Sequence, residues 1–123
     1  MRLLLDSHIL LRLDSDPNLV PAFQREVIAD CANEVFVSAA TAWELGIKQS
    51  NGKLILSKPV SEQRMQFGFL ELPITFAHAE FAATLPLLHR DPFDRMLVAQ
   101  AIVEQMVLVT ADSQLSGYPV KLL

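Results

Sequence analysis

Short apolar runs alternate with stretches of helical periodicity along the whole chain. Aliphatic, β-branched and aromatic runs predict strands at 2–5, 35–38, 70–74, 107–110 and 120–122. Apolar positions three and four residues apart predict helices at 7–14, 21–32, 39–49, 61–68, 75–84 and 92–105, and a short turn or helix at 112–116. The strands read as continuous apolar runs, which is typical of strands buried on both faces. The pattern therefore predicts an α/β fold, with a mainly parallel, twisted central sheet flanked by helices on both faces.

Length and composition fit one globular domain. The 123 residues suffice for one hydrophobic core, and no internal repeat or linker divides them, so we expect a single domain over residues 1–123. Hydrophobic residues make up 51% of the chain and the mean hydropathy is +0.31, yet no apolar run approaches the ~18 residues of a bilayer span. We therefore expect a cytoplasmic protein with no membrane segment, whose surplus apolar surface is covered in a homodimer or by a partner. The one cysteine, Cys31, excludes an internal disulfide and is expected to be a buried or half-buried thiol.

The stretch HRDPFDRMLVAQA contains two aspartates at the predicted start of a helix. Asp91 precedes a proline and fits the N-cap position. Asp94 falls in the first turn, but it shares a helix face with Leu97 and Val98, which is the apolar face. An unpaired buried carboxylate is costly, so Asp94 is expected to have a partner elsewhere in the fold.

Two further aspartates follow predicted strands. Asp6 comes directly after the strand at 2–5, and Asp112 follows the strand at 107–110 after one alanine. Each position also suits a helix cap, because aspartate is a favoured N-cap residue. Either aspartate taken alone is therefore explained as a cap.

A glutamate lies inside the predicted helix at 39–49. Thr41 and Glu44 have the spacing of a capping box, which is the structural explanation for this acid. Glu44 also shares a face with Ala40 and Ile47, with Trp43 beside them, so it lies on the apolar side of the helix. A solvated capping acid more naturally points outward.

The four acids are predicted to converge on one crevice. In a parallel α/β sheet, ligands bind outside the carboxyl ends of the strands, and the following helices begin at the same edge. Converging carboxylates repel one another, and a divalent cation relieves the repulsion. Oxygen ligands without a cysteine or histidine cluster suit Mg²⁺ or Mn²⁺. Such an ion supports phosphodiester hydrolysis without a protein nucleophile.

Four segments of the chain resemble one known family, in that family's order: LLLDSHILL, SAATAWELGIK, HRDPFDRMLVAQA and LVTADSQL. Together they resemble the PIN-domain ribonucleases of the VapC-like class, the toxins of type II toxin–antitoxin pairs. The resemblance covers nearly the whole chain. It implies a catalytic set of metal ligands at Asp6, Glu44, Asp94 and, directly or through water, Asp112. It also implies an RNA substrate, a cognate antitoxin and a homodimer.

The resemblance extends to residues around the acids. Thr110 matches a hydroxyl position beside the last acid, and Ser7 and Ser38 are expected to support the site. Asp91 is expected to be an N-cap first and an additional site acid second. Arg12 stands where similar proteins often carry an aromatic residue.

The charge balance changes once four acids are assigned to a metal. The chain has 14 acidic and 10 basic residues, a formal net charge of −4, so 10 acidic residues outside the site balance 10 basic ones. Lys48 lies one turn after Glu44, and Arg90 and Arg95 flank the two aspartates of the HRDPFDR segment. These three cations are candidates for contacts to RNA phosphates, with an ordinary solvated charge as the alternative for each.

The three histidines lack the spacing of a metal site. His8, His78 and His89 are scattered along the chain. His8, two residues after Asp6, is expected to be an ordinary, partly buried histidine, with a contact to the substrate as the alternative. The apolar segment MQFGFLEL, 65–72, is expected to belong to the core rather than to a partner groove.

Two functions remain open. The first is a metal-dependent endoribonuclease, the toxin of a toxin–antitoxin pair. The alternative is a non-catalytic PIN-like module, whose acids only cap helices and whose apolar surface binds a partner. No residue in the sequence is recognisable as a contact to a ribose 2′-hydroxyl, so the residues alone do not distinguish RNA from DNA as a substrate. Binding of a divalent cation distinguishes the two functions.

Overall fold

The computed structural model describes all residues from 1 to 123 and contains one sheet. Its five strands lie in the order β3-β2-β1-β4-β5, and every pair of neighbours is parallel. The strands are β1 (Arg2–Leu5), β2 (Glu34–Ser38), β3 (Leu70–Leu72), β4 (Val107–Val109) and β5 (Lys121–Leu122). The helices are α1 (Ser7–Ser15), α2 (Ala22–Ala29), α3 (Ala39–Ser50), α4 (Val60–Phe67), α5 (Phe76–Thr84) and α6 (Pro92–Glu104), with 3₁₀ turns η1 (Pro17–Leu19) and η2 (Ser113–Gly117). The predicted α/β fold with a parallel sheet is confirmed.

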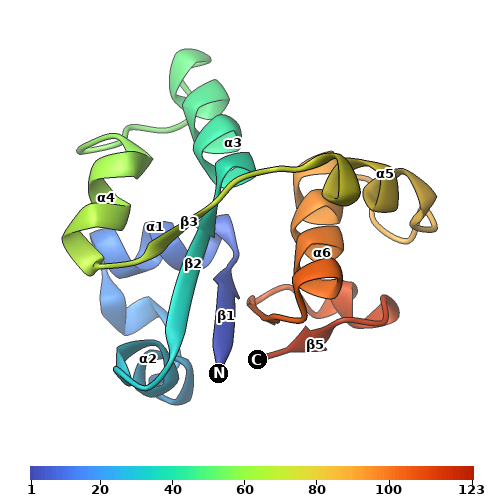
Figure 1. Cartoon of the computed structure of the whole chain (residues 1–123). Coiled ribbons are helices and arrows are strands. Elements are labelled where there is room, and N and C mark those ends of the chain that lie inside the picture. The colour runs from blue at the N-terminus through green and yellow to red at the C-terminus, as the bar shows by residue number, and fades with distance from the viewer.

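The helices cover both faces of the sheet. Helices α1, α2 and α4 lie on one side of β1 and β2, and α5 and α6 lie on the other (Figure 1). Helix α3 belongs to both layers, since Ala40 packs in the core under α6 and Leu45 in the core on the other face. None of these helices is long and apolar enough to cross a membrane.

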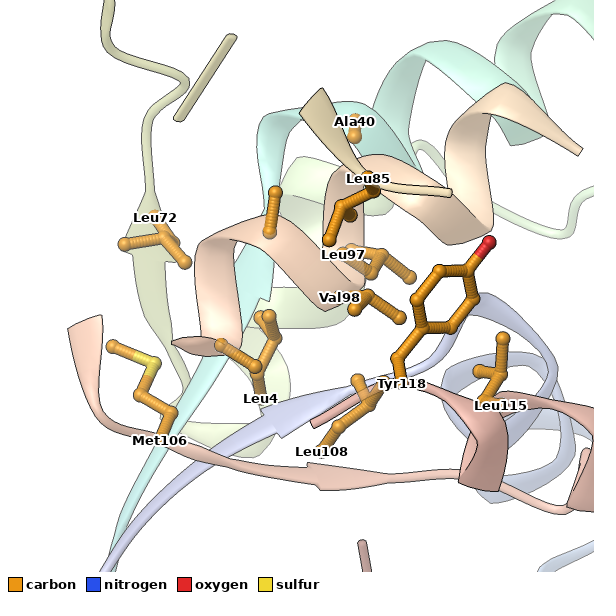
Figure 2. Packing of buried hydrophobic residues seen from close by; sticks show 12 residues of the cluster. Leu4, Ala40, Leu72, Leu85, Leu97, Val98, Met106, Leu108, Leu115 and Tyr118 are labelled. Atoms are coloured by element: carbon orange, nitrogen blue, oxygen red, sulfur yellow. The ribbon is translucent and has the colours of Figure 1, made fainter. Parts of the chain in front are cut away.

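The central strand explains how one sequence fills two cores. Successive side chains of a strand point to opposite faces. Leu3 and Leu5 therefore pack on the α1 side, whereas Leu4 packs on the α6 side, and all three are fully buried. Figure 2 shows Leu4 of β1 in the cluster that also holds Val98 of α6. Burying one such side chain contributes about 1.5–3 kcal/mol, so β1 is anchored from both sides.

The parallel sheet brings several chain segments to one edge. Helix α1 follows the end of β1, α3 follows the end of β2, and the segment 110–112 follows the end of β4. Asp6 donates its backbone N–H to the Val109 carbonyl at 2.9 Å, so the ends of β1 and β4 lie next to each other. The predicted convergence of strand ends therefore occurs.

Helix α2 ends three residues earlier than predicted. Asp30 accepts a hydrogen bond from the backbone N–H of Ala32 at 2.9 Å, which closes a turn instead of continuing the helix. Cys31 lies in this turn and is exposed. The prediction of a buried or half-buried thiol is wrong, because the turn leaves this side chain no core to enter.

The capping-box interpretation of Thr41 and Glu44 is also wrong. Helix α3 begins directly after Ser38, whose hydroxyl accepts a hydrogen bond from the backbone N–H of Ala40 at 3.0 Å. Thr41 therefore lies inside the helix, and Glu44 is free of any capping role. The N-cap of this helix is supplied by the last residue of β2.

Two apolar predictions hold only in part. Glu44 and Ala40 are buried on α3 as expected, but Trp43 is 65% exposed. Within the segment 65–72, Phe69 is buried whereas Met65 is exposed. Both departures leave apolar side chains on the surface, because helical periodicity fixes which residues share a face and not which face the fold covers.

Candidate active site

Asp6 occupies the N-cap position of α1, but its side chain makes no capping hydrogen bond. Only 2% of the residue is exposed. Its Oδ2 accepts a hydrogen bond from the Thr110 hydroxyl at 2.7 Å, and its Oδ1 lies 3.2 Å from the Ser7 hydroxyl. The cap interpretation therefore fails for this carboxylate, which is held by the end of β4 and the start of α1.

Glu44 joins the same group through Ser7. The Ser7 hydroxyl oxygen lies 3.0 Å from Glu44 Oε1, in addition to its contact with Asp6. A hydroxyl has one hydrogen, so Ser7 donates to only one of the two carboxylates at a time. The other oxygen of Glu44, Oε2, accepts a hydrogen bond from Lys48 Nζ at 2.8 Å. This hydrogen bond, together with the charge of Glu44, raises the pKa of Lys48 despite the opposing effect of burial.

A second group of titratable side chains forms around His89. Its Nε2 lies 3.1 Å from Asp112 Oδ2 and 3.5 Å from Asp94 Oδ2. The three ligand-type atoms all lie within 4.8 Å of one another. The sequence prediction missed His89 as a site residue, because it comes from a loop without periodicity. Its place two residues before Asp91 in the HRDPFDR segment was the available signal.

Thr110 connects the two groups. Its hydroxyl donates to Asp6 and accepts a hydrogen bond from the backbone N–H of Asp112 at 3.0 Å. Asp112 also uses Oδ1 to accept a hydrogen bond from the backbone N–H of Gln114 at 2.9 Å, so it caps η2 as well. The Thr110 hydroxyl thus holds Asp6 and Asp112, the two acids that follow strands, in place.

The site has more negative charge than the surrounding protein compensates. The pKa of Asp94 is raised from 3.8 to about 7, first by burial and then by the charges of Asp6 and Asp91, whereas His89 opposes the shift and Glu44 adds a small further increase. Lys48 is the one lysine or arginine within 4.0 Å of the four predicted acids. Clustered carboxylate oxygens with too few protein cations fit a divalent cation such as Mg²⁺ or Mn²⁺.

An open crevice exposes part of this site. It has a volume of about 340 Å³. Its walls are formed by Asp6, His8, Arg12, Asp94, Ala111 and Asp112. Glu44 is buried, does not line the crevice and is connected to Asp6 through Ser7. The structure therefore brings all four predicted acids to one edge of the sheet, and three of them line the crevice.

Two predicted supporting residues contact other groups. Ser38 donates a hydrogen bond to Gln100 Oε1 at 2.5 Å and forms no hydrogen bond with the four acids. Asp91 is the N-cap of α6, where its Oδ1 accepts a hydrogen bond from the Phe93 N–H at 2.9 Å. The first role predicted for Asp91 is confirmed.

The predicted phosphate-binding cations differ in their availability. Lys48 is paired with Glu44, as described above. Arg95 donates hydrogen bonds to the carbonyl oxygens of Ala82 and Leu85, which ties α6 to the end of α5. Arg90 is exposed and forms no ion pair. Arg12, which the sequence did not single out as a phosphate contact, lines the crevice without an acidic partner within 4.0 Å.

The other two histidines have different roles. His8 Nδ1 lies 4.0 Å from Asp6 Oδ1, and its side chain is 59% exposed at the crevice. The prediction of a partly buried His8 is wrong, because this position faces outward on α1. His78 is fully buried, belongs to the capping box of α5 and lies 2.8 Å from Glu104 Oε1.

Comparison with known proteins identifies the family. The PIN domain model matches residues 3–121, so the chain belongs to the PIN domain family. The fold is similar to VapBC2 from Rickettsia felis bound to a promoter DNA fragment, with a TM-score of 0.73, 17% identity, and coverage of 100% of this chain and 98% of that chain. No curated protein sequence gives a significant match.

Two further solved structures share the fold. A toxin–antitoxin complex from Klebsiella pneumoniae has a TM-score of 0.67 and 21% identity, covering 98% of this chain and 94% of that chain. DNA-bound VapBC from Salmonella typhimurium has a TM-score of 0.68 and 14% identity, covering 100% and 97%. The resemblance to PIN domains inferred from the four sequence segments is confirmed.

Proposed function

We propose that this protein is a divalent-metal-dependent endoribonuclease and the toxin of a toxin–antitoxin pair. One observation carries the proposal: two acids that follow β1 and β4 and two acids in α3 and α6 meet at the carboxyl edge of a PIN fold. The protein cations around these acids do not balance their negative charge. Capping explains Asp112 in part, but it does not explain Asp6 or Glu44.

Each site residue has a role in this proposal. Asp6, Glu44 and Asp94 hold Mg²⁺ or Mn²⁺, and Asp112 does so directly or through water. When bound, the ion polarises a phosphoryl oxygen and lowers the pKa of the attacking water. Ser7 and Thr110 hold the Asp6 carboxylate in place by hydrogen bonds. For Asp91, the second role expected is that of an additional site acid, and we propose that it acts through its charge on Asp94 and Lys48.

The RNA backbone is proposed to lie against α1. Arg12 and the exposed His8 are one helical turn apart and line the same crevice as the acids. A free guanidinium suits a phosphate, because its donors match two phosphate oxygens at once. Arg90 is a second candidate, since it is exposed and unpaired, whereas Lys48 and Arg95 already have partners in the protein.

A cognate antitoxin is the proposed partner of the toxin. The similar solved structures include toxin–antitoxin complexes, and this protein has large apolar side chains on its surface, among them Trp43, Ile55 and Phe76. Exposed apolar side chains are typical of surfaces that a second chain covers. We propose that the antitoxin and a second copy of this chain cover such surfaces in the cytoplasm.

Cleavage of RNA by purified protein tests the function. The wild type, free of any partner, is incubated with a mixed pool of structured RNAs and Mg²⁺ or Mn²⁺, beside an Asp94→Asn variant and an EDTA control. An Asp30→Asn variant is the matched control, because Asp30 is an exposed aspartate in the turn after α2. We expect cleavage by the wild type and by Asp30→Asn, and none with EDTA or with Asp94→Asn. Equal background in all samples, with no effect of metal on thermal stability, overturns the proposal in favour of a partner-binding module.

A further inference from the structure

The loop that carries His89 is fixed by a buried tyrosine. The Tyr118 hydroxyl accepts a hydrogen bond from the backbone N–H of His89 at 3.0 Å and donates one to the carbonyl oxygen of Pro86 at 2.8 Å. Tyr118 is 3% exposed and belongs to the core cluster that includes Leu97 and Leu115 (Figure 2). The backbone of His89 is therefore tied to the core, and its ring has a defined place.

The hydrogen bonds of the ring define its tautomer. The backbone N–H of Asp91 donates to His89 Nδ1 at 3.2 Å, so Nδ1 carries the lone pair. In the neutral imidazole the hydrogen is then on Nε2. This N–H faces Asp112 Oδ2 at 3.1 Å, with Asp94 Oδ2 at 3.5 Å as the more distant neighbour. His89 is a hydrogen-bond donor to the acids.

The short distances between His89, Asp94 and Asp112 taken alone would make His89 a metal ligand. His89, Asp94 and Asp112 are close enough to ligate one ion together. Ligation through Nε2 requires the lone pair on that atom and moves the hydrogen to Nδ1. The hydrogen on Nδ1 would then face the Asp91 N–H, with 3.2 Å between the two nitrogens. Two donors pointed at each other repel, so the backbone of Asp91 opposes ligation by His89.

We propose that His89 is a positioning residue that holds Asp112 for the metal and does not bind the metal itself. This inference rests on the proposed function. Asp112 is held at both oxygens, by the Gln114 N–H at Oδ1 and by His89 Nε2 at Oδ2. Partners that orient a ligand in this way usually change metal affinity about 10- to 100-fold when removed. A set of ligands made only of oxygen atoms also favours Mg²⁺ or Mn²⁺ over zinc, which prefers imidazole.

The tautomer is measured directly by nitrogen NMR of the imidazole in ¹⁵N-labelled wild type. We expect the hydrogen on Nε2 and the lone pair on Nδ1, both without metal and with saturating Mg²⁺. A hydrogen on Nδ1 in the Mg²⁺ state, or a metal-induced change at Nε2 typical of ligation, overturns the inference. This measurement needs no RNA.

The affinity for metal tests the role of His89 as a hydrogen-bond donor to Asp112. Calorimetric titration with Mn²⁺ compares the wild type with His89→Ala and His89→Gln, after thermal unfolding in EDTA confirms that each variant is folded. We expect His89→Ala to weaken Mn²⁺ binding about 10- to 100-fold, and His89→Gln to recover most of it, because the glutamine amide keeps an N–H donor. Unchanged affinity in His89→Ala overturns this inference alone. A wild type that binds no divalent cation overturns both the proposed function and the role of His89.

Discussion

Replacing Asp94 with asparagine is expected to stabilise the metal-free protein at neutral pH. Asparagine keeps the shape of the side chain but has no charge to bury beside Asp6, Asp91 and Glu44. The same substitution removes a proposed metal ligand. If Asp94 serves the chemistry at the expense of stability, its replacement raises stability and lowers activity.

The raised pKa of Asp94 sets the size and the sign of the effect. In the unfolded chain the carboxyl group loses its proton near pH 3.8, whereas in the folded, metal-free protein it keeps the proton up to about pH 7. Between these values the folded state binds the extra proton, so stability falls as pH rises. At about 1.4 kcal/mol per pKa unit, the wild type loses up to about 4 kcal/mol across this range, and the asparagine variant does not. The Asp94 side chain is 13% exposed, so solvent screens part of this effect. We therefore expect the variant to be more stable than the wild type by about 2–4 kcal/mol.

Urea unfolding in EDTA at several pH values measures this difference. We expect the stability of Asp94→Asn relative to the wild type to increase as the pH rises from about 4 to about 8, with its steepest change below pH 7. Asp30→Asn, the exposed control, should show no such increase. Saturating Mg²⁺ should remove most of this difference, because a ligand at 100 times its Kd adds about 2.7 kcal/mol to the stability of the wild type alone. A variant that is no more stable than the wild type at pH 8 in EDTA refutes the reasoning.

Three further predictions address single contacts. Thr110→Val removes the hydroxyl between Asp6 and the Asp112 N–H, so chemical denaturation should show a loss of about 1–3 kcal/mol and calorimetry a weaker affinity for Mn²⁺. Lys48→Met leaves the buried Glu44 without its cation and should cost about 1–2 kcal/mol in urea unfolding, less than for a fully buried pair because Lys48 is 39% exposed. Arg12→Ala, made in the Asp94→Asn background to prevent cleavage, should weaken binding of single-stranded RNA and reduce the slope of log affinity against log salt by about 0.7. Fluorescence anisotropy across a salt titration checks the last prediction, with the exposed Lys53→Ala as a control of equal charge.

The sequence predicted the parts of the site that depend on backbone topology. Asp6 and Asp112 follow strands, and parallel strands end at one edge, so their meeting follows from the alternation of strands and helices. Asp94 followed from a helical period that placed a carboxylate on a buried face, where it needed a partner. These arguments depend on the order of elements and not on side-chain detail.

The contributions of loops and free side chains could not be predicted in this way. His89 reaches Asp112 from a loop that Tyr118, far along the chain, holds by a hydrogen bond. Arg12 lines the crevice from α1 and has no acidic partner within 4.0 Å. Cys31 is exposed because of a turn that Asp30 closes. Each case depends on a long-range or irregular contact, for which the hydrophobic period carries no signal.

Titration of Mn²⁺ into the metal-free wild type, beside Asp6→Asn and Asp94→Asn, tests the central claim most directly. The claim is that the acids at the carboxyl edge of the sheet hold a divalent cation. We predict saturable binding by the wild type and a large loss of affinity in both variants, each of which remains folded in EDTA. A wild type that binds no Mn²⁺, or variants that bind it as tightly as the wild type, contradict the account.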